Sequence, residues 1–168
     1  MSFSLYAASI PAFVTTLSGL SKILDKAAAH CEAKKIDPAT LLGMRLYPDM
    51  FSFTRQVQLT CDFAKNTAGR LTGEPPKIPD EEKSFAELKA RIAKTVDYLK
   101  GFKPADIDAT AAKEVTFPIG PQKTMTLKGD AFLLGFGLPN FYFHATTAYD
   151  ILRHAGLEIG KRDFLGRA

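Results

Sequence analysis

A chain of 168 residues with 46% hydrophobic and 24% charged residues has the size and composition of one globular domain, which we place over residues 1–168. The net charge is +4, but 22 basic residues are dispersed among 18 acidic ones, so we expect no nucleic-acid partner. Apolar runs stop short of the ~18 residues that a membrane span needs, and the N-terminus lacks a secretion signal. We therefore expect a cytoplasmic protein without membrane contacts.

The first long helix is predicted over residues 10–35, where apolar side chains recur every three or four residues and Pro11 falls in the first turn after Ser9. Asp37 is a typical N-cap for a short helical turn that stops at Gly43. Cys31 forms no spacing motif with Cys61, so both are expected to be reduced side chains on helix faces.

The second helix is predicted over residues 49–72, with Asp49 as its N-cap. Its polar stripe is open to two interpretations, a solvated face or a functional face; the stripe consists of Arg55, Gln58, Asp62, Lys65 and Gly69. The prolines within residues 74–79 indicate a surface loop. Ser84 and Glu87 have the spacing of a capping box, which predicts a third helix over residues 84–101.

Alternating apolar residues near 113–128 predict a short β-hairpin, the only β-structure we expect. The last helical region, residues 130–156, begins at the N-cap Asp130 and should be kinked by Gly135, Gly137 and Pro139. The predicted fold class is therefore all-α: a four-helix bundle with a small inserted β-hairpin.

The last helix contains the most informative pair. Asn140 and His144 are four residues apart, so they lie one above the other on a helix, on the same stripe as apolar residues that face a core. An imidazole and an amide on a buried face are a candidate functional site. Asn140 follows Pro139, so it is equally interpretable as a cap for the second half of a broken helix.

These residues carry a resemblance to the DinB/YfiT-like superfamily of four-helix bundles, and more closely to a bacterial branch of it of unknown function. The resemblance rests on three stretches of the sequence: Asp49-Met50 with Arg55-Gln56-Val57, Pro139 to His144 with Thr147-Ala148-Tyr149, and Gly160-Lys161 with Asp163 to Gly166. The last stretch, in the C-terminal tail, is expected either to cover the mouth of a pocket or to dock on the bundle.

The resemblance implies a site for zinc or nickel, because metal-binding members hold a divalent ion with three histidines and several are transferases or hydrolases. Counting back from Arg153 places His144 at the second ligand position and Asn140 at the first. The second helix has no histidine, and Gln58 or Asp62 would be its nearest substitute. One imidazole with an amide is a poor donor set for such ions, so we expect no cofactor.

Two functions are therefore carried forward. The first is a metal-free bundle with a small-molecule pocket around His144, Asn140, Gln58 and Asp62, in which His144 is either a ligand contact or a core histidine satisfied by Gln58 or Asp62. The alternative is a diverged divalent-metal-dependent transferase or hydrolase with His144 on the ion. A symmetric homodimer is also expected, because three residues lie off the apolar stripes and would otherwise face water: Leu59, Phe63 and Tyr142.

Overall fold

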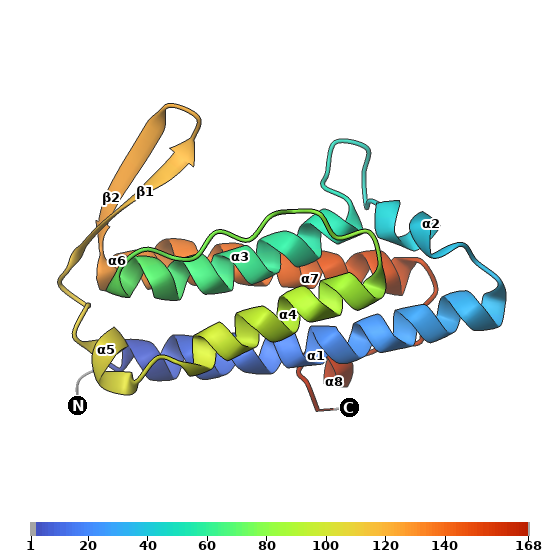
Figure 1. Ribbon diagram of the computed structural model, residues 1–168, viewed down its shortest axis with the longest axis horizontal. Helices are drawn as coiled ribbons and strands as arrows, with labels where there is room; N and C mark the ends of the chain where they lie inside the picture. The colour runs from blue at the N-terminus through green and yellow to red at the C-terminus, as the bar shows by residue number, and fades with distance from the viewer. Residues whose placement is uncertain (1–2, 168) are drawn as a thin grey trace.

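Four long helices pack side by side in the computed structural model, which describes residues 3–167 (Figure 1). They are α1 (Leu5–Lys34), α3 (Phe53–Thr72), α4 (Phe85–Lys100) and α7 (Leu138–His154). Helices α1 and α7 run in one direction along the bundle, and α3 and α4 run in the other. The predicted all-α bundle with one hairpin is confirmed.

The connection between α3 and α4 has to return along the whole bundle because these two helices are parallel. Figure 1 shows this segment, residues 73–84, lying along α3 and α4. The bundle also carries four short α-helices; they are α2 (Pro38–Gly43), α5 (Pro104–Asp108), α6 (Gly129–Phe132) and α8 (Lys161–Phe164). The proline-rich part of the connection is extended, as predicted for prolines that remove donors and exclude helix.

The hairpin is formed by strands β1 (Glu114–Gly120) and β2 (Lys123–Lys128), which pair antiparallel and project from one end of the bundle (Figure 1). The register is interrupted between Pro118 and Gly120, where the proline cannot donate to the ladder. Val115 and Phe117 are buried against the bundle, while the rest of the hairpin is largely exposed. The hairpin is therefore anchored through its base.

Helix α1 begins five residues earlier than the sequence predicts. Its N-cap is Ser4, not Ser9, and the first-turn amide of Tyr6 donates to the carboxylate of Asp108 at 2.9 Å. This acceptor comes from α5, a hundred residues away, so sequence reading cannot find it. Pro11 consequently lies inside the helix.

The length and composition of α1 would also allow it to cross a membrane. An 18-residue window within it has a mean hydropathy of 1.3, so our expectation of only short apolar stretches was too strict. Half of that window is buried inside the bundle. A core helix of a soluble protein has these same properties, and α1 packs directly against α4 and α7.

The four capping predictions have different outcomes. Ser52, not Asp49, caps α3, and Asp130 lies inside α6 instead of preceding it. The capping residues Asp37 and Ser84 are confirmed, since each side chain accepts a hydrogen bond from a first-turn amide. The wrong assignments arise because Asp, Ser and Asn occur in turns as well as at helix starts.

The predicted kink in the last helical region is a π-helical segment, η1 (Leu133–Gly137), between α6 and α7. Gly137 allows this segment to approach α3, because a Cβ atom at Gly137 would lie 2.6 Å from the Thr67 side chain. Pro139 has no amide hydrogen, so the α-helical ladder is interrupted here. This local irregularity positions the start of α7 beside α3.

The C-terminal tail docks on α1. A Cβ atom at Gly19 would lie 2.9 Å from the carbonyl oxygen of Asp163, so the tail backbone packs directly on this glycine. Lys26 forms an ion pair with Asp163, and Phe164 packs edge-on against Tyr149 of α7. The tail was expected either to cover a pocket or to dock on the bundle, and these contacts correspond to docking.

Candidate functional site

His144 lies on α7 where this helix packs against α3, and it is 7% exposed. Its Nδ1 atom is 2.7 Å from Oε1 of Gln56 on α3. Since an amide oxygen only accepts, Nδ1 carries the proton in this arrangement. The amide nitrogen of Gln56 faces the carbonyl oxygen of Phe51 at 3.5 Å, which is consistent with this orientation of the amide.

Aromatic rings enclose the imidazole. The ring of Phe63 stacks on it with centroids 5.2 Å apart and an interplanar angle of 16°, and Phe143 meets it edge-on at the same centroid distance. Burial and, to a lesser extent, the nearby charge of Arg55 together lower the pKa of His144 to about 4. His144 is therefore neutral at pH 7.

The second ring nitrogen of His144 is not fully enclosed. Among side chains in residues 3–167, the only enclosed nitrogen or oxygen without a hydrogen-bond partner is Nε of Arg91. Nε2 of His144 makes no hydrogen bond among these residues, so it must reach solvent. With Nδ1 protonated, Nε2 presents a lone pair that accepts a hydrogen bond.

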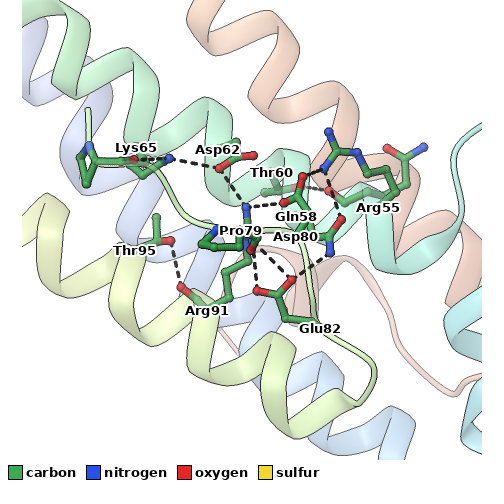
Figure 2. Close-up of polar contacts among 12 residues, drawn as sticks. Arg55, Gln58, Thr60, Asp62, Lys65, Pro79, Asp80, Glu82, Arg91 and Thr95 are labelled. Carbon is green, nitrogen blue, oxygen red and sulfur yellow. Dashed lines mark hydrogen bonds and ion pairs between the residues drawn. The ribbon is translucent and has the colours of Figure 1, made fainter. Parts of the chain in front are cut away.

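The structure corrects the predicted partner of His144. Gln58 and Asp62 were expected to face it, but Gln56 does so. Gln56 and Gln58 are two residues apart on a helix, which separates their side chains by about 200°. A chain of hydrogen bonds and ion pairs on the opposite side of α3 contains both Gln58 and Asp62 (Figure 2).

That opposite face is organised around Arg91 of α4, whose side chain is fully buried. Its Nη2 atom lies 2.9 Å from carboxylate oxygens of both Asp62 and Asp80, and its other terminal nitrogen, Nη1, lies 3.0 Å from Glu82 (Figure 2). Nη1 also donates to the carbonyl of Pro79 at 2.9 Å. We call these five residues the Arg91 cluster; it fastens the connection at residues 73–84 to α3 and α4.

Neighbouring polar groups complete the Arg91 cluster. Gln58 donates to Glu82 at 2.8 Å, and Lys65 lies 3.3 Å from Asp62. Burial pushes the pKa of Glu82 upward, but hydrogen bonds from Arg91 and Gln58 outweigh it and leave that pKa below its ordinary value. The Arg91 cluster is an ion network around one buried cation, and each of its three carboxylates has a cationic or amide partner.

Asn140 lies one turn before His144 and makes a local contact. Its Nδ2 atom donates to the carbonyl oxygen of Phe136 at 2.8 Å, within the irregular segment that precedes α7. The amide thus stabilises the broken helix from the carbonyl side instead of capping amide groups. Whether Asn140, Gln58 and Asp62 bind a ligand together with His144 stays a prediction.

The donor set does not fit the metal that the family resemblance implies. No group of three His, Cys, Asp or Glu side chains able to hold an ion occurs between residues 3 and 167. Nδ1 of His144 bonds to Gln56, the Asn140 amide nitrogen bonds to a carbonyl, and Asp62 is paired with Arg91 and Lys65. A transition-metal site needs three strong donors that converge, and these side chains point to other partners.

The cysteines offer no alternative chemistry. Cys31 and Cys61 are free and buried, as predicted. Desolvation raises the pKa of Cys61 to about 12, so its thiol stays protonated at neutral pH. A protonated, buried thiol is not a nucleophile, and Cys61 acts as a core side chain.

Comparison with known proteins defines the class first. A solved structure of a DinB family member protein from Shewanella denitrificans is 45% identical to this chain, covers 96% of it and 92% of its own length, and superposes with a TM-score of 0.89. The chain is therefore a DinB-like bundle.

The particular family follows from a second match. Residues 5–165 match the domain of unknown function DUF1993, and the chain belongs to this family. No functionally curated protein matches it. The predicted resemblance to an uncharacterised branch of the DinB-like bundles is thereby confirmed.

Proposed function

We propose that this protein is a metal-independent binding module that recognises a small molecule at the surface over His144. The observation that carries the proposal is the state of the imidazole: Gln56 holds the proton on Nδ1, and the Nε2 lone pair reaches solvent. A neutral imidazole held in one tautomer is a directional hydrogen-bond acceptor. No observation among the described residues favours a metal-dependent transferase or hydrolase.

The surroundings of Nε2 indicate the kind of ligand. Phe143 is 57% exposed beside His144, and Phe51 is 53% exposed where its carbonyl faces the Gln56 amide. Arg55 lies over the Phe51 ring at 6.0 Å. Exposed rings next to a single acceptor favour a flat, mostly apolar ligand that carries one O–H or N–H donor.

Titration with phenol, followed by NMR of the full chain, tests this proposal. Saturable shifts at His144 and Phe143 are expected, and Phe143→Ala should weaken them without unfolding the bundle because Phe143 is an exposed side chain. His154→Ala, which changes an exposed histidine at the end of α7, is the matched control. Equal shifts in the Phe143→Ala and wild-type proteins would contradict the proposal.

Metal independence has its own test. Elemental analysis of protein purified without chelator should find no stoichiometric zinc or nickel. Either metal at one ion per chain would revive the enzyme alternative, with His144 as a ligand.

We also propose that the protein is a cytoplasmic bacterial protein that assembles as a symmetric homodimer. Tyr142 supports this assembly, because it is 37% exposed on α7, whereas Phe63 is half-buried against Phe136 and His144 and offers less free surface than expected. Light scattering at micromolar concentration should give twice the chain mass of 18.4 kDa, and Tyr142→Lys should reduce it. A wild-type mass near that of one chain would exclude the dimer.

A further inference from the structure

A cavity of about 700 Å³ lies between the second half of α3, the connection after it and the start of β1. Its lining combines polar and apolar side chains; among them are Asn66, Arg70, Lys77, Ile78, Lys113 and Val115. Small-molecule sites in proteins commonly have volumes of roughly 300–1,000 Å³. The cavity is thus large enough for a metabolite, and His144 is not among its lining residues.

The charge balance of this cavity is positive. Four basic and two acidic side chains line it. One of the acids, Asp62, is already paired with Arg91 and Lys65, so its charge is compensated. The other, Glu74, is exposed to solvent. The interior of the cavity therefore favours an anion.

Arg70, one of the basic residues that line this cavity, has no anionic partner among the residues that the structure describes. It is half-buried, with its guanidinium 6.0 Å from the centre of the Phe117 ring, and it makes no ion pair or hydrogen bond among residues 3–167. Desolvation lowers the pKa of Arg70, although the group stays charged at neutral pH. A partly desolvated guanidinium without a carboxylate can gain a charge-assisted hydrogen bond by binding an anion.

The negative end of α3 also faces this region, and a basic residue screens it. Lys113 donates from Nζ to the carbonyl oxygen of Leu71 at 2.8 Å. The amide of Gly73 donates to the carbonyl of Gly69, and the hydroxyl of Thr72 donates to the carbonyl of Ala68. The helix end is therefore occupied by donors. The guanidinium of Arg70 is not used by these carbonyls and can bind an anion from solution.

We propose that this cavity binds a small organic oxyanion, a carboxylate or a phosphate ester, through Arg70. The planar guanidinium donates two parallel hydrogen bonds to such a group. Lys113 lines the same cavity and has N–H donors besides the one bonded to Leu71. Ile78, Val115 and the prolines form an apolar wall for the rest of the molecule. The two oxyanion chemistries share this mode of recognition, and two probes separate them.

NMR titration of the full chain at low salt, with phenyl phosphate and benzoate as separate probes, tests the proposal. At least one probe should give saturable shifts at Asn66, Arg70 and Thr116, which line the cavity. Arg70→Gln should weaken that binding about ten-fold or more, the effect of losing a charge-assisted hydrogen-bond pair. Arg162→Gln removes the same charge from an exposed position in α8 and should change nothing.

The same experiment separates this site from the one over His144. Phe143→Ala should leave oxyanion binding unchanged, since Phe143 is not among the residues that line the cavity. Thermal unfolding of each variant verifies that the bundle is intact. The absence of saturable binding for both probes, or an equal loss in Arg70→Gln and Arg162→Gln, would overturn the proposal.

Discussion

Helix α3 separates two polar regions that differ in how their buried polar groups are paired. Towards α7, one neutral pair, His144 and Gln56, is enclosed by aromatic rings. Towards α4, the Arg91 cluster buries one full charge, the Arg91 guanidinium, and compensates it with three partly exposed carboxylates. The first arrangement leaves one lone pair available, whereas the second leaves no carboxylate unpaired, so only the first has spare capacity for a ligand.

This difference has a clear energetic signature. A neutral hydrogen-bonded pair contributes modestly to the free energy of unfolding, and removing one partner costs the desolvation of the group that stays behind. Removing the buried cation of an ion network takes the shared partner from several carboxylates at once, which costs more. The two regions should therefore respond very differently to substitution and to pH.

Replacing the central cation of the Arg91 cluster should have the largest effect. Arg91→Met leaves Asp62, Asp80 and Glu82 without their shared partner and should lower the free energy of unfolding by about 3–5 kcal/mol, as measured by urea denaturation. Lys89→Met is the matched control on the same helix; its ion pair with Asp25 is exposed, so it should cost less than about 1 kcal/mol. Equal effects in the two variants would mean that the cluster is not energetically buried.

Much of the bundle was predictable because periodicity and helix breakers are local signals. The four long helices, the hairpin and the break before α7 follow from apolar spacing and from Gly and Pro positions. The partners of α3 were not predictable. The sequence predicts Gln58 and Asp62 as partners of His144, but Gln58 bonds to Glu82 in the connection and Asp62 pairs with Arg91. These contacts depend on which helices are neighbours in the bundle, and local sequence patterns do not specify that.

The correct partner of His144 nevertheless had a sequence signal. Gln56 belongs to the Arg55-Gln56-Val57 stretch on which the family resemblance rests, yet it was not considered as a facing residue. Gln56 precedes the buried Val57 and Thr60 on the α7 side of α3. A polar residue within the apolar half of a helix is the pattern to search for in other sequences of this type.

Acid titration should separate the two regions next. The pKa of His144 is about 4 in the folded protein and ~6.5 when unfolded, so the unfolded chain binds more protons between these values. Stability present above pH 6.5 should therefore be lost as the pH falls towards 4, by at most roughly 3 kcal/mol. His144→Gln should flatten the pH dependence of the unfolding free energy in this window.

The Arg91 cluster should respond to acid only at lower pH. The pKa of Glu82 is depressed, so its contribution to stability is complete above its ordinary value and is lost as the pH falls below it. A wild-type stability that stays constant from pH 6.5 to 4 would show that His144 is not held neutral.

A smaller effect should follow from changing the amide that faces the imidazole. Gln56→Ala removes the acceptor for Nδ1–H and should lower the free energy of unfolding by about 1–3 kcal/mol, because a buried donor is left unsatisfied. Gln58→Ala also removes hydrogen bonds, but it should leave the imidazole unchanged. Denaturation gives the energies, and the Nδ1–H proton resonance of His144 should shift only in Gln56→Ala.

The most direct test of the account is the ¹⁵N NMR spectrum of the His144 imidazole at pH 7, recorded with and without one equivalent of zinc. We predict a neutral ring protonated on Nδ1, with a free Nε2 and no change on adding the metal. A ring protonated on Nε2 or on both nitrogens, or a large stoichiometric shift of Nε2 with zinc, would contradict the proposal of a metal-free bundle with a neutral acceptor at its surface.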